Sequence, residues 1–264
     1  MPRTRSPEPT VVLTFDNLGE ASEMERGTWP AGRPAGRHPS VTEALPRLLA
    51  ELSDLGLLAT FFIEAINCEL NPEAVRAIAQ RGHEVGIHGW RHESWAGLEP
   101  EHERVLLKRS RAAHRDIGVD AHGFRPPGGA INADTPALLR EIGCRWVSPC
   151  GTVAHVDDDG FGWVRFDWAL VDAYHLMRRF APLRERRGER AAPLPSRTAA
   201  GRLRTLLQRG RAPRTLILHP FLVADDDSWS EVRRLLRMLA DRREQGQISL
   251  VTGGQLTEQL SAQR

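Results

Sequence analysis

The sequence predicts an α/β fold in which parallel strands alternate with helices. Short apolar runs, such as TVVLTF at 10–15 and LLATFFI at 57–63, recur along the chain, and such runs are typical of strands buried on both faces. Segments with apolar residues at helical spacing separate the runs, and strands joined by helices pair in parallel. A barrel and a doubly wound sheet both satisfy this pattern. No glycine-rich phosphate-binding fingerprint follows the first strand, which disfavours a nucleotide-binding sheet.

Residues typical of element ends bound the expected strands and helices. Ser40 is a favourable N-cap for the first long helix, Gly56 ends it, and Pro72 opens the next one. Strands are expected at 10–15, 57–63, 84–87, 123–125, 145–148, 163–168, 215–218 and 248–251. Helices are expected at 40–55, 72–81, 99–117, 133–142, 198–208, 230–243 and from 255 onward.

Two long segments interrupt the alternation. The first, at 18–39, is rich in glycine and proline, and loops of this length are often functional, so we expect it to form the rim of an active site. The second, at 177–197, is rich in arginine, proline and alanine. Its arginines between Arg178 and Arg190 are interpreted as a solvated excursion, with contact to an acidic partner or subunit as the alternative. No linker divides the chain, which favours one domain over 1–264.

Composition excludes several classes of function. The formal net charge is +2, which gives no general reason to expect binding to nucleic acid or to an anionic membrane. No run is long enough to span a bilayer, and the first residues lack the apolar core of a signal peptide. Cys68, Cys144 and Cys150 show no CxxC spacing, so reduced thiols in a cytoplasmic protein are expected.

The stretch from Gly82 to Glu93 contains two histidines, His88 and His92, directly after a short apolar strand. If the backbone turns helically after His88, the four-residue spacing places both imidazoles on one face. Two neutral imidazoles can hold a divalent cation such as zinc when a third ligand completes the site. The pair alone is a weak signal, because such histidines are more often solvated.

Further polar residues fall at the carboxyl ends of other expected strands. In a barrel these ends form one face, where catalytic residues gather. The combination of acids, an arginine and histidines at separate strand ends is hard to explain by ordinary loop polarity, and it predicts one shared site. The residues are Asp16, Asn17, His88, Arg125, Asp167 and His219.

Short motifs around these residues resemble those of the polysaccharide deacetylase superfamily, also called NodB homology or carbohydrate esterase family 4. They occur in that family's order across nearly the whole chain. The motifs are TFDN at 14–17, HGWRH at 88–92, RPPGG at 125–129, FDW at 166–168 and LILH at 216–219. HGWRHE and the stretch TFFIEAINCE are more similar to the allantoinase-like, cyclic-imide-acting branch. The resemblance implies a distorted (β/α) barrel of about seven parallel strands.

The resemblance also implies catalytic roles. Asp16 matches the general base that accepts a proton from water, and Arg125 matches the arginine that orients this base. His219 matches the general acid, supported by the Asp167 carboxylate, and Gly128 takes the position whose N–H contributes to the oxyanion hole.

The resemblance further implies a divalent metal, with zinc expected, held by His88 and His92. The chain departs from the family at Asn17, where the family has an aspartate that ligates the metal. A neutral amide is a weaker ligand than a carboxylate. Three possibilities are open: Asp16 or Asn17 is the third ligand, Glu20 or Glu93 reaches into the site, or the site works without metal.

The function expected from these residues is hydrolysis of a non-peptide C–N bond, with deacetylation of an N-acetylated sugar-like or secondary-metabolite substrate preferred. Ring opening of a cyclic amide or imide is the alternative within the enzymes, and a catalytically silent binding protein is the alternative outside them. The oligomeric state stays open, with a homo-oligomer as one possibility. The substrate pocket is expected to include Trp29, Trp90, Glu93 and Trp168, for which a packing role is equally compatible with the sequence.

Overall fold

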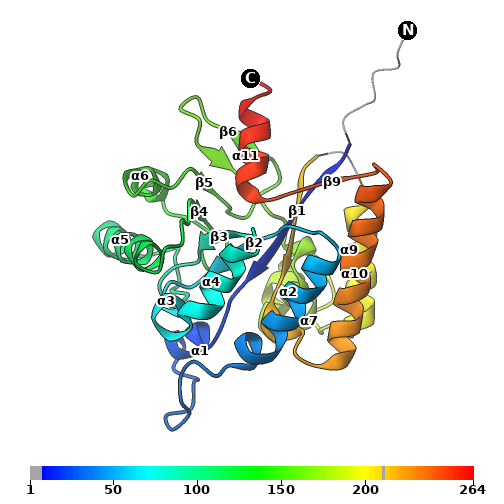
Figure 1. Ribbon diagram of the computed structural model, residues 1–264, viewed down its shortest axis with the longest axis horizontal. Coiled ribbons are helices and arrows are strands. Elements are labelled where there is room, and N and C mark those ends of the chain that lie inside the picture. The colour runs from blue at the N-terminus through cyan, green and yellow to red at the C-terminus, as the bar shows by residue number, and fades with distance from the viewer. Residues whose placement is uncertain (1–7, 210–211) are drawn as a thin grey trace.

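One curved sheet with helices around its outside forms the molecule (Figure 1). The computed structural model describes residues 8–209 and 212–264. Nine strands follow the order β6-β7-β5-β4-β3-β2-β1-β8, with β9 beside β1, and every pair is parallel except β6 with β7. The strands are β1 (Thr10–Asp16), β2 (Thr60–Ile63), β3 (Glu84–Ile87), β4 (Gly123–Phe124), β5 (Trp146–Val147), β6 (His155–Val156), β7 (Gly162–Trp163), β8 (Arg214–Leu218) and β9 (Ser249–Val251).

The helices connect successive parallel strands, as the alternation of the sequence predicts. Most of them lie on the convex side of the sheet. The exception α11, whose Leu256 packs with Val12 and Trp146, stands at the end opposite to α1 (Figure 1). The helices are α1 (Ala21–Glu25), α2 (Leu45–Asp54), α3 (Asn67–Leu70), α4 (Pro72–Gln80), α5 (Pro100–Asp116), α6 (Thr135–Glu141), α7 (Asp172–Leu176), α8 (Ala181–Arg186), α9 (Ser196–Leu207), α10 (Asp226–Glu244) and α11 (Gly253–Ser261).

The sheet curls so that the chain after β7 meets β8. Val171 forms a parallel bridge with Ile217 of β8, and the Thr215 hydroxyl donates a hydrogen bond of 2.9 Å to the carbonyl of Arg165. These contacts bring two distant segments of the chain together at the seam of the curl. The predicted distorted (β/α) barrel is thereby confirmed.

The alternation of side chains along β1 decides which residues face the interior of the curl. Val11 packs in the large cluster shared with the surrounding helices, whereas Val12 packs with Phe62 and Trp146 in a second cluster. Because strand side chains alternate with a period of two, Asp16 lies on the same face as Val12. The interior face therefore ends, at the carboxyl end of β1, in a carboxylate.

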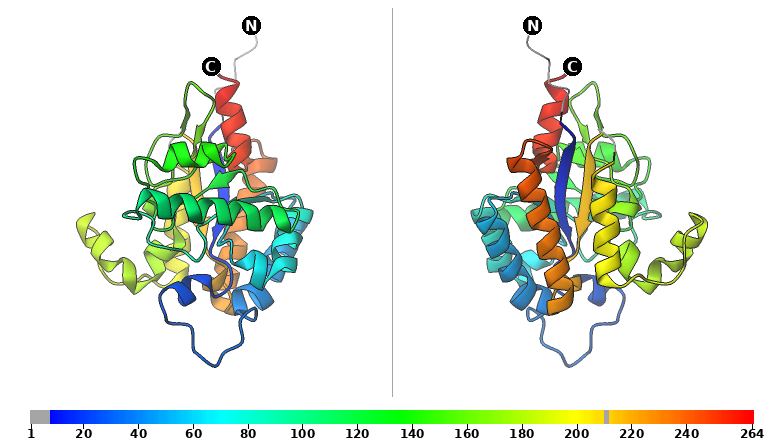
Figure 2. Two further views of the ribbon diagram at one scale, coloured as in Figure 1. Left: turned by 90° about the vertical axis from the view of Figure 1, so that its left-hand side faces the viewer. Right: turned by 90° about the vertical axis from the view of Figure 1, so that its right-hand side faces the viewer.

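Several elements differ from the expected ones. Of the strand expected at 163–168, only Trp163 lies in a strand, the two-residue β7, and the short antiparallel β6 was not predicted. Within the rim loop at 18–39 the chain forms α1, and the arginine-rich segment at 177–197 contains α8, which projects from one side of the molecule (Figure 2). Among the described residues, no helix combines the length and apolarity needed to cross a membrane.

Candidate active site

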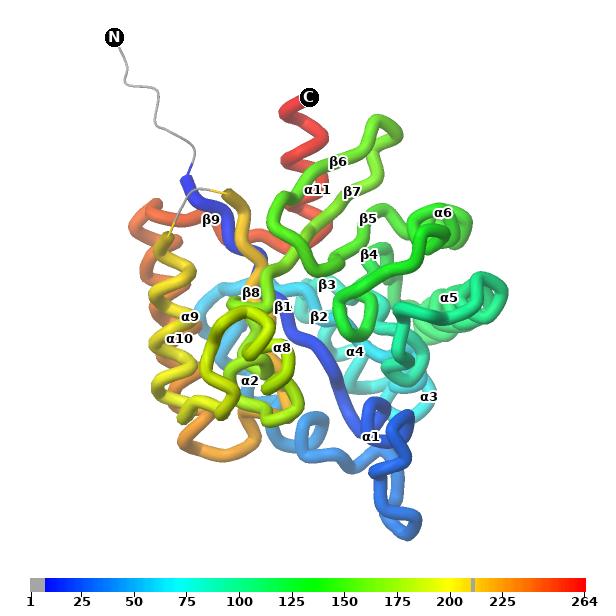
Figure 3. Tube along the Cα trace, turned by 180° about the vertical axis from the view of Figure 1, so that it is seen from behind, coloured from blue at the N-terminus to red at the C-terminus, as the bar shows by residue number. Residues whose placement is uncertain are grey.

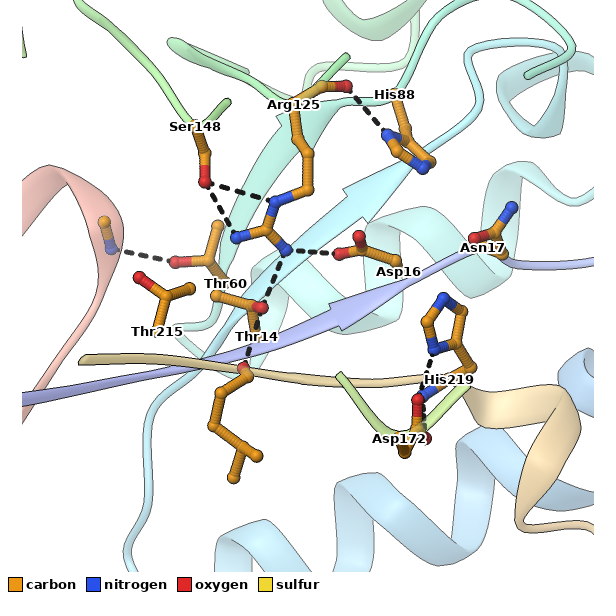
Figure 4. A network of polar contacts seen from close by, with 12 residues as sticks. Thr14, Asp16, Asn17, Thr60, His88, Arg125, Ser148, Asp172, Thr215 and His219 are labelled. Atoms are coloured by element: carbon orange, nitrogen blue, oxygen red, sulfur yellow. Dashed lines mark hydrogen bonds and ion pairs between the residues drawn. The ribbon is translucent and has the colours of Figure 1, made fainter. Parts of the chain in front are cut away.

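The carboxyl ends of the strands surround a cavity of about 500 Å³. Its lining includes Asp16, His88, Arg125 and His219, which end or follow β1, β3, β4 and β8. The structure thus brings together the predicted residues of four strands, because parallel strands present their carboxyl ends at one face. Figure 4 shows these side chains converging from different strands.

An ion pair joins Asp16 to Arg125 inside the barrel, with 2.6 Å between Oδ1 and Nη1. Arg125 is only 1% exposed, and it also donates hydrogen bonds to the hydroxyls of Thr14 and Ser148 (Figure 4). Its guanidinium lies 4.0 Å from the centre of the Phe62 ring. Burial lowers the pKa of Arg125, and the Asp16 carboxylate opposes this effect. With its donors directed at fixed acceptors, Arg125 fixes the position of the Asp16 carboxylate.

His88 and His92 line the cavity together, as predicted, but no helix joins them. The segment between them is an irregular loop, and His92 has a φ of 75°, a backbone conformation that few side chains adopt. Two hydrogen bonds hold this loop, since the Glu93 carboxylate accepts from the backbone N–H of Trp90 and of Arg91. The tight turn, rather than helical periodicity, brings the two imidazoles to a centroid separation of 5.0 Å.

Hydrogen bonding and burial prepare the two imidazoles as ligands. Nδ1 of His88 lies 2.8 Å from the carbonyl oxygen of Arg125, so Nδ1 donates and Nε2 keeps its lone pair. Burial lowers the pKa of His88 to about 3. Burial and the neighbouring His88 lower the pKa of His92 well below its ordinary value. Neutral imidazole is the form that binds metals.

The third member of this cluster is Glu64, which the sequence reasoning missed. Ligand atoms of Glu64, His88 and His92 all lie within 4.8 Å of one another. Glu64 directly follows β2 and is fully buried. The pKa of Glu64 is raised to about 8, mainly by burial and to a smaller extent by the Asp16 charge, against the opposing hydrogen bonds from the Leu18 N–H and the Asn17 amide. A buried carboxylate between two neutral imidazoles is a donor set that fits a divalent cation such as zinc.

Asn17 has a role other than the expected weak ligand. Its Nδ2 donates a hydrogen bond of 2.6 Å to Oε1 of Glu64, and its backbone takes a φ of 63°, which asparagine tolerates better than most residues. The amide therefore holds the carboxylate that faces His88 and His92. Neither Glu20 nor Glu93 belongs to this cluster, because each binds the backbone of its own loop. Position 64 supplies the anionic group that is missing at position 17.

The carboxylate next to His219 belongs to Asp172 and not, as expected, to Asp167. Nδ1 of His219 lies 2.5 Å from Oδ1 of Asp172, and the backbone N–H of His219 donates to Oδ2 at 2.8 Å (Figure 4). Asp172 is 3% exposed and begins α7 directly after Val171, whose bridge to β8 carries it to His219. Asp167 instead accepts from the Ala169 N–H and pairs with Arg187 at the surface.

The remaining predicted residues divide between the cavity and the packing. Gly128 lines the cavity with a φ of 78°, and within the described chain its N–H has no hydrogen-bond partner. Trp168 and Glu93 also line the cavity. Trp90 is buried under the guanidinium of Arg109, and Trp29 donates to a carbonyl inside the rim loop. Neither tryptophan reaches the cavity lining, so both expected pocket contacts are corrected.

Comparisons with known proteins show which family the chain belongs to. The family model "Polysaccharide deacetylase" matches residues 3–147, a stretch that includes Asp16, Glu64, both histidines and Arg125. Peptidoglycan-N-acetylglucosamine deacetylase of Bacillus cereus is 33% identical over 90 residues, which are 34% of this chain and 33% of that protein. Chitin deacetylase 1 of Saccharomyces cerevisiae is 33% identical over 127 residues, 48% of this chain and 38% of that protein. The chain thus spans little more than a third of these relatives.

Solved structures extend the likeness to the whole fold. A polysaccharide deacetylase homologue from Mycobacterium smegmatis is 25% identical with a TM-score of 0.83, covering 98% of this chain and 92% of its own. PuuE allantoinase is 15% identical with a TM-score of 0.72, and the match covers 99% of this chain and 98% of the allantoinase chain. The family match spans more than half of the chain. The chain belongs to the polysaccharide deacetylase family.

Proposed function

We propose that the chain is a hydrolase that adds water to the acyl carbon of a non-peptide amide and cleaves the C–N bond. One observation carries the proposal: two oriented proton-transfer groups share one cavity. The Asp16 carboxylate is fixed by Arg125, and the His219 imidazole is fixed by Asp172. A pocket that only binds a ligand has no use for such a pair.

Asp16 acts as the general base in this proposal. It accepts a proton from water as the water oxygen bonds to the acyl carbon, and Arg125 keeps the carboxylate aimed at the cavity. Charge then develops on the acyl oxygen. Gly128 lines the cavity, and its backbone N–H, which has no partner among the described residues, is proposed to donate to that oxygen.

His219 acts as the general acid. Its Nδ1–H donates to Asp172, so Nε2 is the nitrogen left to carry the transferred proton. Asp172 stabilises the imidazolium, and this cation protonates the leaving nitrogen as the C–N bond breaks. The products are a carboxylate and an amine.

Glu64, His88 and His92 are proposed to hold one divalent cation, with zinc preferred. The fit rests on a fully buried carboxylate and two imidazoles kept neutral by burial. When bound, such a cation polarises the acyl oxygen and lowers the pKa of a water beside it. The carboxylate provides the charge, and Asn17 keeps that carboxylate in place.

The preferred reaction is deacetylation of an N-acetylated sugar-like or secondary-metabolite compound. The family membership and the names of the curated relatives support it. Ring opening of a cyclic amide is the second candidate, supported by the likeness to PuuE allantoinase across almost the whole chain. Cytoplasmic location and a homo-oligomeric state stay predictions; three free cysteines support the first.

The test is hydrolysis by the purified protein of an N-acetyl panel and a cyclic-imide panel. Wild type is expected to release acetate from the first or a half-amide from the second, and Asp16→Asn is expected to lose turnover while keeping its unfolding profile. Turnover retained by folded Asp16→Asn contradicts the assigned base. A folded, metal-loaded wild type that hydrolyses neither panel contradicts the proposed reaction.

A further inference from the structure

Two arginines from distant segments meet at the mouth of the cavity. Arg26 follows α1, in the rim loop at 18–39, and Arg179 belongs to a short 3-10 turn, Arg178–Phe180, in the arginine-rich segment. Both line the same cavity as Asp16 and His219. Figure 3 shows α1 following the carboxyl end of β1 and α8, in the arginine-rich segment, beside that strand.

Neither arginine forms a direct ion pair with a carboxylate within the described chain. Nη1 of Arg26 donates to the Ser22 hydroxyl, and the guanidinium of Arg179 lies over the ring of Phe180. Other arginines nearby are paired, for example Arg187 with Asp167 and Arg202 with Glu189. Among the described residues, Arg26 and Arg179 therefore line the cavity with no carboxylate bound to either guanidinium.

The carboxylates of the cavity are mostly engaged elsewhere. Asp16 pairs with Arg125, and Glu93 accepts from two backbone N–H groups. Glu25 is the remaining lining carboxylate, and it forms no ion pair with Arg26 or Arg179 among the described residues. Of the three arginines that line the cavity, only Arg125 is paired with a carboxylate, so Arg26 and Arg179 keep guanidinium donors for an anionic group of a ligand.

The two arginines are close enough to repel each other. Partial burial lowers the pKa of Arg179, the charge of Arg26 lowers it further, and the Asp172 carboxylate opposes both effects. Both arginines also lower the pKa of His92. Each side chain is solvent-exposed, so water screens the repulsion. Like charges that converge on a cavity are a favourable arrangement for an anion that lies between them.

An aromatic wall stands beside the arginines. Trp168 contacts both Phe166 and Phe180, with ring centroids 5.3 and 5.2 Å apart, and all three rings line the cavity. A cavity of about 500 Å³ suits a small molecule. The wall and the arginines together favour a ligand with a planar or apolar body and a charged end.

We propose that the substrate is a small amide carrying an anionic group, a carboxylate or a phosphate, which Arg26 and Arg179 bind at the cavity mouth. The proposal rests on the hydrolase function proposed above and names its substrate class. It separates this chain from enzymes acting on neutral sugar polymers. The arginines would set KM by holding the end of the substrate remote from the scissile bond.

The test measures charge preference with matched probes. Two pairs differ only by charge or by one phosphate: N-acetylglycinate with N-acetylglycinamide, and N-acetylglucosamine 6-phosphate with N-acetylglucosamine. Calorimetric binding and hydrolysis are measured for wild type, Arg26→Gln, Arg179→Gln and the control Arg178→Gln. Arg178 is the exposed neighbour of Arg179 in the same turn and does not line the cavity.

Wild type is expected to bind the anionic member of at least one pair more tightly, and each cavity variant to lose about tenfold of that preference. The pair that shows the preference identifies carboxylate or phosphate. Arg178→Gln should match wild type.

Equal binding of charged and neutral members, or a preference that survives in the Arg26→Gln, Arg179→Gln double variant, overturns the anion site. If only neutral amides are turned over efficiently, the anion site is overturned but the hydrolase proposal still holds. Arginine-dependent anion binding without turnover of any amide would support the anion site and contradict the proposed hydrolase function.

Discussion

Replacing Glu64 by glutamine should change how stability depends on pH in the metal-free protein. The side chain keeps its size, and its one amide oxygen can still accept a hydrogen bond from Asn17, but it no longer titrates. The hydrogen bond that Oε2 accepts from the Leu18 N–H is lost, which lowers stability equally at every pH. The pKa of Glu64 rises from 4.5 to about 8 through burial. Between these two pH values the folded state binds more protons at this group than the unfolded state, so this group makes stability fall as pH rises.

The size of the effect follows from the shift. Each unit of pKa corresponds to about 1.4 kcal/mol, so ionising Glu64 without a cation disfavours the folded state by roughly 4 to 5 kcal/mol at and above pH 8. The buried histidines act in the opposite direction, because their pKa values are lowered and the unfolded state binds more protons below pH 6.5. They are common to both proteins, so the difference between wild type and Glu64→Gln isolates Glu64.

Urea unfolding of chelator-treated protein at intervals from pH 4.5 to 8.5 measures this difference. The variant is expected to gain stability relative to wild type steadily across the window. A saturating divalent cation should remove the gain, since it stabilises the ionised carboxylate of wild type. Parallel stability profiles for the two metal-free proteins would refute the assignment of Glu64 as an uncompensated buried carboxylate.

Three further changes probe the neighbouring groups. Asp172→Asn should lower kcat about a hundredfold by removing the carboxylate that stabilises the His219 imidazolium, whereas Asp167→Asn should stay near wild type; steady-state kinetics compares them, and equal losses would contradict the pairing. Asn17→Gly keeps the positive φ but removes the hydrogen bond to Glu64, so zinc affinity in a chelator competition should fall about tenfold; unchanged affinity would count against that contact. Arg125→Lys should lower the free energy of unfolding by about 3 kcal/mol in denaturant titrations, because an ammonium cannot reach the same set of acceptors.

Much of the fold and half of the site follow from local sequence rules. Apolar runs alternating with helical stripes predict parallel strands, and the common face of their carboxyl ends predicts that Asp16, His88, Arg125 and His219 meet. The same rule applied to the strand ending at Ile63 would have found Glu64, because that residue is the first polar one after the strand.

Other features depend on contacts that no local pattern encodes. Which of Asp167 and Asp172 reaches His219 is decided by the bridge between Val171 and Ile217, which joins segments far apart in the sequence. His92 approaches His88 through a strained turn and not through a helix, and helical spacing gives no information about such a turn. The two-residue strands are too short to show a periodicity.

The position of a bound metal tests the central claim most directly, because the site as described has its anionic ligand at Glu64 in place of position 17. Crystals grown with zinc and measured at the zinc absorption edge would locate the ion from its anomalous signal. A single peak within bonding distance of Glu64, His88 and His92, with the Asn17 amide still hydrogen-bonded to Glu64, is the expected result. A peak bound to Asp16 or Asn17 and remote from Glu64, or no peak between the two histidines at saturating zinc, would contradict it.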